Sequence, residues 1–255
     1  MDLELAGKAF LITGGTDGLG LALAERIVAE GAHVAVCGRD EDRLTQAQAR
    51  LGGDALCFEA DVTDPVQLDE FLAASLERFD RLDGVVNNAG RSAGSPVATS
   101  SDDAWRDDFE LKVIAAVHLT RLALPALAES RGSVLNVLAT LARTPPPNST
   151  PSSAARAAGL ALTKALAHEV GARGIRVNAI LIGLIESGQW VRRAAASGTA
   201  LEDFYASGAQ AAGVPLGRYG RAAEFADLAA FLLSARASYI TGVGIALDGG
   251  LSPAI

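Results

Sequence analysis

The chain has 255 residues, 49% of them hydrophobic, and its 22 basic and 30 acidic side chains give a formal net charge of -8. A chain of this length and composition can bury one large core, so we expect a single domain over residues 1–255. The acidic balance, with no stripe of Lys and Arg, argues against a nucleic-acid partner. An acidic start and charges that interrupt the apolar runs predict no signal peptide and no membrane partner, hence a cytoplasmic protein.

The cysteines and histidines do not suggest a metal site. Cys37 and Cys57 lack ligand spacing and lie in or beside apolar runs, so we expect buried, reduced thiols. His33, His118 and His168 are scattered over a turn and two expected helices. No metal is predicted.

In the first third of the chain, short apolar runs alternate with longer helical patterns. Asp64 and Pro65 are a cap residue and a first-turn proline, which predict a clean helix start. The runs and helices expected here are 8–13, 20–31, 33–38, 41–51, 55–60, a helix from Asp64, and 82–88. Such alternation predicts βαβ units and a parallel sheet with helices on both faces.

The same pattern continues to the C-terminal end. PPP at 145–147 breaks regular structure and marks a loop between a strand and a helix. The expected elements are a long helix around 101–125, a strand at 132–139, a helix within 148–170, a strand at 175–182, a less regular segment at 183–215, a helix at 222–234 and a last strand within 242–250.

A glycine-rich segment, TGGTDGLG (Thr13 to Gly20), follows the first strand and opens the first helix. Such a bend lets the backbone approach a pyrophosphate and points helix N-terminal amides at it. The alternative is a tight strand-to-helix turn with no ligand. By itself the string favours a nucleotide only modestly.

Several further motifs follow this segment in order: DVTD at 61–64, NNAG at 87–90, IRVNAI at 175–180, PLGRYGRAAEFADLAAFLLS at 215–234 and YITGVGIALDGG at 239–250. With them the whole chain resembles the short-chain dehydrogenase/reductase family, in its Tyr-x-x-x-Lys branch. The resemblance implies an α/β fold, a single Rossmann-type doubly wound domain whose parallel seven-stranded sheet has strand order 3-2-1-4-5-6-7. It also implies a substrate lid at 183–215 and a homo-oligomer, tetramer or dimer.

The resemblance also assigns cofactor-binding residues. The pyrophosphate would lie on Gly14, Thr16, Gly18, Leu19 and Gly20. The residues expected around the rest of the cofactor are Asp61 and Val62 at the adenine, Asn88, Ala89 and Gly90 at the adjoining ribose, and Arg156 and Ser187 at the nicotinamide end.

The end of the second strand bears on cofactor preference. Gly38 stands where an NAD enzyme places an acid for the ribose hydroxyls, and Arg39 follows it. This pattern favours NADP(H) over NAD(H). Asp17 opposes the preference, because a carboxylate in the glycine loop repels a phosphate. The alternative for Arg39 is a solvated side chain at a helix start.

The family's catalytic tetrad, Asn, Ser and Tyr-x-x-x-Lys, has no match at the expected positions. The Tyr and Lys positions fall on Ser152 and Arg156, and the usual Ser position falls on the inert Ala139. The Asn position falls on Lys112, if Trp105 is the tryptophan of the long helix. A serine hydroxyl is a weak acid, and Arg156 can hold a ribose but cannot relay protons.

Lys112 is the candidate that could restore proton transfer. It shares a helix stripe with Phe109 and Ala116, which points its stem inward. Burial and a neighbouring guanidinium would lower its pKa, making it a general acid or base that acts through Ser152. The alternative is that Lys112 fills space and pairs with a backbone carbonyl or a carboxylate such as Glu110.

Two further groups of side chains have open interpretations. The acids of SDDAWRDDFE at 101–110 crowd the first turns of a helix, so we expect them to stabilise its dipole and face solvent. Trp190, Phe204 and Tyr205 belong to the expected lid, where they could line an apolar pocket or form the lid's own core.

Three functions are compatible with these patterns. The first is an NAD(P)(H)-dependent oxidoreductase that acts on a carbonyl or alcohol of a small molecule through a non-standard or impaired proton relay. The second is a catalytically silent nucleotide-binding protein or subunit. The third is a lyase or isomerase built on the same fold.

Overall fold

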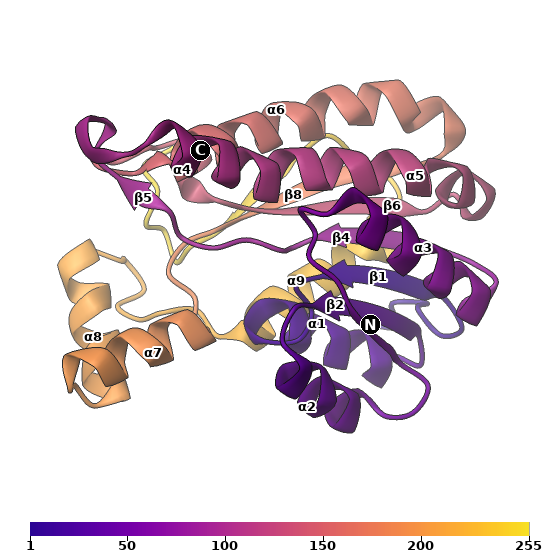
Figure 1. Cartoon of the computed structure of the whole chain (residues 1–255), viewed down its shortest axis with the longest axis horizontal. Coiled ribbons are helices and arrows are strands. Elements are labelled where there is room, and N and C mark those ends of the chain that lie inside the picture. Colours follow the sequence, from indigo (N-terminus) through magenta and orange to yellow (C-terminus); the bar gives the residue numbers. More distant parts are fainter. Residues whose placement is uncertain (255) are drawn as a thin grey trace.

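The computed structural model describes residues 1–254 and is organised around one seven-stranded parallel sheet (Figure 1). The strand order is β3-β2-β1-β4-β6-β8-β9. The seven strands are β1 (Ala9–Thr13), β2 (His33–Gly38), β3 (Leu56–Glu59), β4 (Gly84–Asn87), β6 (Ser133–Ala139), β8 (Arg176–Ile182) and β9 (Gly244–Leu247). Taken in chain order, these strands confirm the expected 3-2-1-4-5-6-7 arrangement and the Rossmann-type fold.

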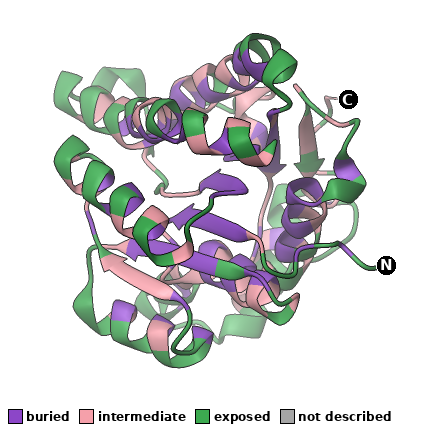
Figure 2. Cartoon of the chain, turned by 90° about the vertical axis from the view of Figure 1, so that its right-hand side faces the viewer, coloured by how far each residue is buried: buried purple, intermediate pink, exposed green. Residues whose placement is uncertain are grey.

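Helices cover both faces of the sheet, and Figure 2 shows purple buried strands between layers whose outer sides are green. One layer contains α1 (Gly18–Ala29), α2 (Glu41–Leu51) and α9 (Ala222–Leu233). The other contains α3 (Pro65–Phe79), α5 (Ala115–Ser130) and α6 (Ser152–Val170). Successive strand residues point to opposite faces, so Phe10 packs in one apolar core and Leu11 in the other.

The predicted start of α3 is confirmed. The Asp64 carboxylate accepts hydrogen bonds from the backbone N–H groups of Val66, at 2.9 Å, and Gln67, at 3.4 Å, and Pro65 occupies the first turn. This cap places α3 beside β3, with the turn that carries Asp61 and Val62 just before it. The local sequence therefore fixes one wall of the cleft described below.

The long helix expected at 101–125 is a composite of three pieces that ends later, at Ser130. The pieces are α4 (Asp102–Phe109), a π-helical turn η2 (Glu110–Ile114) and α5. Arg131 ends the helix with left-handed backbone, at φ 52°. A π-turn holds one extra residue and often lies at a functional site.

This composite helix is also the one stretch among residues 1–254 that is long and apolar enough to span a membrane by length and composition. An 18-residue window within Asp102–Ser130 has a mean hydropathy of 1.5. Arg121 lies within this window, so a charge still interrupts the apolar run, as expected. Core helices of globular proteins pass the same test, and Leu119, Ala123 and Leu127 of this helix are fully buried in the core shared with β4 and β6.

The segment expected to be irregular contains two helices, α7 (Gly188–Ser197) and α8 (Leu201–Ala212), which project from the body in orange in Figure 1. Gly198 and Gly213 end them with left-handed backbone, at φ 67° and 68°. The short elements that the sequence did not indicate are the antiparallel pair β5 (Gly94–Ser95) and β7 (Thr150–Pro151) and the 3-10 turns η1 (Val97–Thr99), η3 (Thr140–Ala142), η4 (Gly171–Arg173) and η5 (Ala235–Ala237).

The two thiols differ in exposure. Cys37 is fully buried in β2, and burial raises its pKa to about 12. Cys57, on edge strand β3, is only half-buried, so the expectation of two buried thiols is wrong for it. Within residues 1–254, no three His, Cys, Asp or Glu side chains gather where a metal ion could bind.

Candidate active site: one cleft with two different ends

A cleft of about 550 Å³ opens at the carboxyl ends of the strands, between the glycine-rich loop and α7 of the expected lid. Thirteen residues with a predicted role line it: Gly14, Thr16, Gly18, Leu19, Arg39, Asp61, Val62, Asn88, Ala89, Gly90, Ser152, Arg156 and Ser187. Two predicted residues, Gly20 and Lys112, do not line it, for different reasons given below.

Gly20, which was expected to meet the pyrophosphate, does not line the cleft. A Cβ at this position would lie 2.4 Å from the Gly14 carbonyl oxygen and 2.6 Å from the Asn88 side-chain nitrogen. Glycine is therefore required so that α1 can pack closely against the loop. Gly14 itself lines the cleft with positive φ, at 63°, which favours glycine.

Asn88 holds the glycine-rich loop in place. Its side-chain amide donates to the carbonyl oxygens of Thr13 and Gly14, both at 2.9 Å, and its backbone N–H donates to Thr13 Oγ1 at 3.0 Å. The Asn88 amide is thus already used by the protein. Its role is to tie the end of β4 to the loop after β1, and the expected ribose contact does not come from this amide.

Asp17, which seemed at odds with a phosphate, is balanced by two arginines. Its carboxylate accepts from the Gly18 N–H at 2.7 Å as the N-cap of α1. It also lies 3.7 Å from Arg43 Nη1 and 3.6 Å from Arg192 Nη1 of the lid helix. Both arginines line the cleft, and the sequence reasoning missed both because their partner stands on a different element.

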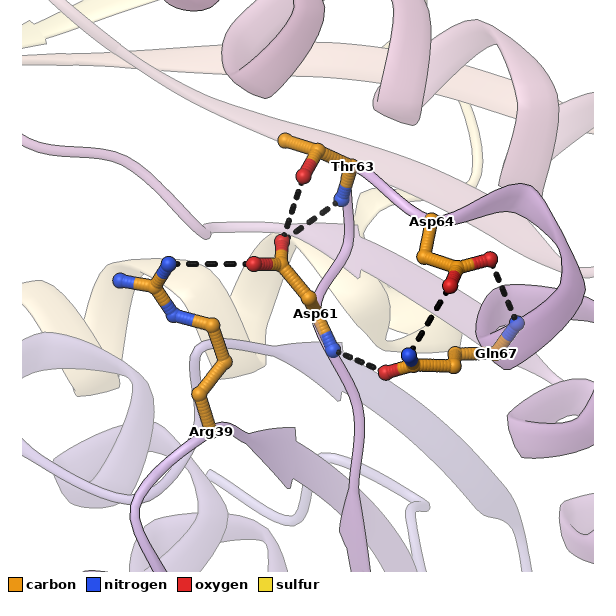
Figure 3. Close-up of polar contacts among 5 residues, drawn as sticks. All are labelled: Arg39, Asp61, Thr63, Asp64 and Gln67. Carbon is orange, nitrogen blue, oxygen red and sulfur yellow. Dashed lines mark hydrogen bonds and ion pairs between the residues drawn. The ribbon is translucent and has the colours of Figure 1, made fainter.

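The end of the cleft that is expected to hold the adenine is built by a polar network (Figure 3). Arg39 Nη1 donates to Asp61 Oδ2 at 3.1 Å, and the other oxygen of Asp61 accepts from the Thr63 N–H at 2.9 Å and the Thr63 hydroxyl at 2.7 Å. The Asp61 N–H donates to Gln67 Oε1 at 2.8 Å, and Gln67 is held in turn by Asp64 at 2.9 Å. Arg39 is therefore exposed but oriented, not free in solvent.

Position 38 excludes the acid that would favour NAD. A Cβ on Gly38 would lie 2.7 Å from Thr16 Oγ1, so no carboxylate side chain fits there unless the Thr16 side chain moves. Gly38 and Thr16 thus leave Arg39 as the charged group at the end of β2.

At the other end of the cleft the lining offers no ordinary acid. Ala139 lines it with a methyl group, and the described residues around the cleft include no tyrosine and no histidine. Ser152 opens α6, and Arg156 follows one turn later. Arg156 Nη1 donates to the Val137 carbonyl oxygen at 2.5 Å, and burial lowers the pKa of Arg156 to about 10, so it stays charged at neutral pH.

Lys112 lies directly behind Ser152 and is shielded from solvent. Its Nζ donates to Ser152 Oγ at 2.9 Å and to Asp108 Oδ1 at 2.5 Å, and its side chain is 1% exposed. The prediction of an inward stem is confirmed. The alternative, pairing with a carboxylate, is also borne out, but the partner is Asp108 and not Glu110, which is exposed. Burial and the nearby Arg156 lower the pKa of Lys112 to about 8, against the opposing effect of Asp108.

Asp108 is the functional residue that the sequence reasoning placed wrongly. It was expected to face solvent with the other acids of 101–110, but its side chain is 1% exposed and its second oxygen has no hydrogen-bond partner. Asp108 and Lys112 are four residues apart across the start of the π-turn, so both point toward α6. The four-residue spacing from a buried lysine was the signal that could have identified it.

The lid aromatics serve both suggested purposes. Trp190 lines the cleft, and Phe204 packs against Trp190 and Tyr205. Trp190 and Tyr205 both pack against Tyr219. Ring centroids are 5.6 Å apart for Trp190 and Tyr219 and 4.9 Å for Tyr205 and Tyr219. The lid therefore has its own small aromatic core.

The cleft fits a dinucleotide. Ser187, expected at the nicotinamide amide, has a buried hydroxyl that no other described residue bonds, and its residue lines the cleft. An unpartnered buried hydroxyl is costly unless a ligand satisfies it. The glycine-rich loop and Arg39 lie further along the same wall.

Comparisons with known proteins agree with this geometry. The family model described as enoyl-(acyl carrier protein) reductase matches residues 14–252. A short chain oxidoreductase of Pseudomonas aeruginosa, described as containing an atypical catalytic center, is similar over 100% of both chains in its apo structure, at 36% identity and TM-score 0.94. Its NADPH-bound structure is 37% identical over 97% of this chain and 98% of that one, at TM-score 0.92.

Two curated relatives are also similar over nearly their full length. L-fucose dehydrogenase of Bos taurus is 35% identical over 256 residues, which cover 98% of this chain and 91% of the relative. The 3-oxoacyl-[acyl-carrier-protein] reductase FabG of Salmonella typhimurium is 32% identical over 250 residues, which cover 98% and 99%.

A doubly wound sheet with a glycine-rich loop and a wide cleft at its carboxyl edge defines a nucleotide-binding protein of the dehydrogenase class. The full-length matches narrow the class. The chain belongs to the short-chain dehydrogenase/reductase family of NADP-binding oxidoreductases.

Proposed function

We propose that this protein interconverts a carbonyl compound and the corresponding alcohol with NADP(H), and that Lys112 and Ser152 handle the proton. The observation that carries the proposal is the 2.9 Å hydrogen bond from the buried Lys112 Nζ to Ser152 Oγ, because Ser152 lines the cleft and Lys112 does not. The redox chemistry named for the relatives supports the reaction class.

The cofactor would be held along one wall of the cleft. Arg39, together with Arg43, would take the 2′-phosphate, which gives the preference for NADP(H) over NAD(H). Arg156 would hold the nicotinamide ribose, and Ser187 the carboxamide. NADPH, when bound, supplies the hydride.

The proton path starts from the hydrogen-bond directions. Lys112 donates to Ser152 Oγ, so the Ser152 hydrogen is free to point into the cleft toward a carbonyl oxygen. As negative charge develops on that oxygen, Ser152 gives up its proton and takes one from Lys112 Nζ, which is left as a neutral amine. In the oxidative direction the same two groups accept the proton from the alcohol.

The charges around Lys112 suit proton transfer in both the reductive and the oxidative reaction. Asp108 stabilises the ammonium form, and burial together with Arg156 favours the neutral amine, which leaves the pKa of Lys112 at about 8. A general acid–base group works best when its pKa is near the working pH. An arginine could not replace this lysine, because a guanidinium does not release its proton.

The Pseudomonas aeruginosa relative lends further support. It combines a catalytic center described as atypical with bound NADPH. A cofactor cleft beside unusual catalytic residues therefore has a counterpart of the same fold and length.

A fluorescence titration with NADPH and NADH, followed by NADPH consumption with a panel of aldehydes and ketones, tests the proposal. We expect tighter binding of NADPH, and turnover that Ser152→Ala lowers by about 100-fold or more, as the loss of a positioned proton donor does. Binding of neither cofactor would refute the proposal. So would turnover that Ser152→Ala leaves unchanged.

A second candidate is a nucleotide-binding protein without hydride chemistry. It is favoured by Ala139 at the usual serine position and by the absence of tyrosine and histidine from the described lining. Tight NADPH binding with no turnover on the carbonyl panel would support it. Conversion of a substrate at equal rate without any cofactor would instead indicate the lyase or isomerase class.

A further inference from the structure

Arg91 differs from every other arginine that lines the cleft. Arg39 pairs with Asp61, Arg43 and Arg192 pair with Asp17, and Arg156 bonds the Val137 carbonyl. Arg91 is exposed and makes no ion pair and no side-chain hydrogen bond with any residue of 1–254. Its five N–H donors are available to a ligand in the cleft.

Arg91 lies at the end of the cleft that Ser152 and Arg156 line, which we call the catalytic end. It follows Gly90 directly, and Gly90 lies beside Arg156, whose Nη2 would be 3.1 Å from a Cβ at position 90. Its charge also acts on Lys112: after burial and Arg156, Arg91 is a further cause that lowers the pKa of Lys112. Three cationic side chains, Arg91, Arg156 and Lys112, therefore share this end of the cleft.

The negative charges nearby do not balance these three. The two acids that line the cleft, Asp17 and Asp61, are already paired with arginines of the cofactor wall. Asp108 is buried behind Ser152 and paired with Lys112. The charge of Asp108 acts on Arg156 as well as on Lys112, and Arg91 has no carboxylate partner among the described residues. One carboxylate thus faces three cations, so this end of the cleft favours an anionic ligand.

A carboxylate suits an exposed guanidinium in particular, because two parallel N–H groups match its two oxygens. We propose that the substrate is an oxo acid whose carboxylate binds Arg91 while its carbonyl oxygen faces Ser152. The inference rests on the proposed function, which places the carbonyl oxygen at Ser152. It makes Arg91 the residue that selects an anionic substrate over a neutral one.

The same proximity has a chemical benefit. A carboxylate at Arg91 offsets one positive charge near Lys112, which makes it easier for Lys112 to remain protonated until it is needed. A neutral ketone would bind without this compensation. An oxo acid should therefore both bind more tightly and be reduced faster than a neutral ketone.

Calorimetric titration of the full chain in complex with NADP+ tests the inference without reduction taking place. The probes are 2-oxobutanoate and 3-oxobutanoate, each beside its methyl ester, which keeps the shape and removes the charge. We expect at least one acid to bind about tenfold more tightly than its ester, as a charge-assisted hydrogen bond implies. In Arg91→Gln the ratio should fall to about one, with the affinity for the ester and for NADP+ unchanged.

Arg121→Gln is the matched control, because Arg121 is exposed on α5 and does not line the cleft. It should keep the wild-type ratio of acid to ester affinity.

The inference would be overturned by no measurable binding of either acid, by equal binding of acid and ester, or by a preference that survives Arg91→Gln. If the ester is reduced as fast as the acid, the oxidoreductase proposal stands and the oxo-acid inference fails. If the chain binds no NADP+, the oxidoreductase proposal fails, and the same titration on the cofactor-free chain still decides the role of Arg91.

Discussion

The two ends of the cleft are held together by different kinds of contact. At the cofactor end, backbone amides and carbonyls of the glycine-rich loop, Asn88 and the Asp61 turn form a network near the surface, and its charges are paired. At the catalytic end, Lys112, Asp108 and Ser152 form a buried side-chain network between two helices. The first is formed largely by backbone groups and the second by buried side chains, although both join segments that are far apart in the chain.

The difference has an energetic consequence. An exposed ion pair such as Arg39–Asp61 contributes little to stability because solvent screens it. A buried pair such as Lys112–Asp108 is costly to break, since the remaining charge is left without compensation. Changes at the catalytic end should therefore affect both activity and folding, whereas changes at the cofactor end should alter binding alone.

The largest effect is expected for Lys112→Met. Without the ammonium group Ser152 has no proton supply, so kcat for reduction should fall by about 100- to 10,000-fold. The Kd for NADPH should stay within about twofold, because Lys112 does not line the cofactor wall. Lys164→Met, at an exposed position of α6, is the control. An unchanged kcat would exclude Lys112 from the mechanism.

Asp108→Asn should destabilise the fold by about 3 kcal/mol at pH 7, since it leaves a buried ammonium without its counter-ion. The pKa of Lys112 is already lower in the fold, about 8, than its ordinary 10.5, so the unfolded chain holds more protons in that range and stability should rise with pH there. The loss should thus be smaller at pH 9 than at pH 7. Urea unfolding at both pH values measures it, and equal losses would contradict the assigned charges.

The pH dependence of turnover should reflect the same group. Reduction requires protonated Lys112, so its rate should fall by about tenfold per pH unit above a midpoint near the pKa of about 8. Oxidation requires the neutral amine and should rise through the same midpoint. Stopped-flow traces of NADPH absorbance in both directions would show it. A midpoint that persists in Lys112→Met belongs to another group.

The smallest of these effects is expected at the cofactor end. Arg39→Gln should weaken NADPH binding by about tenfold through loss of a charge-assisted contact, while NADH binding stays unchanged. Protein fluorescence titrations with the two cofactors measure the ratio, and the melting temperature should not change because Arg39 is exposed. Equal weakening for both cofactors would place Arg39 away from the 2′-phosphate.

The sheet and the cofactor wall could be predicted from sequence because their signals are local. Strand alternation, the Asp64 cap and the glycine-rich segment each specify structure within a few residues, and the strand order followed from the family resemblance. Gly20 and Asn88 show the limit of such signals. Both lie in the expected motifs, but only the packing of α1 and β4 against the loop shows that Gly20 and the Asn88 amide support the loop.

The catalytic end was harder to predict because its buried side-chain contacts belong to no local motif. Periodicity correctly placed Lys112 inside, and its proposed link to Ser152 spans 40 residues. The partner Asp108 was missed because acids in the first turns of a helix usually face solvent. The lid segment was expected to be irregular. Its two helices, α7 and α8, are short and each ends in a glycine, so their helical pattern was not recognised in the sequence.

The π-turn at Glu110–Ile114 lets a cation reach Ser152 from the helix that neighbours α6. A positive charge can therefore stand beside Ser152 although the residue that carries it is not part of the α6 sequence motif. Searches that define this kind of site by a string within α6 would pass over such chains. A search for a lysine and an acid four residues apart at a widened turn, facing the first residue of the adjacent helix, would find them.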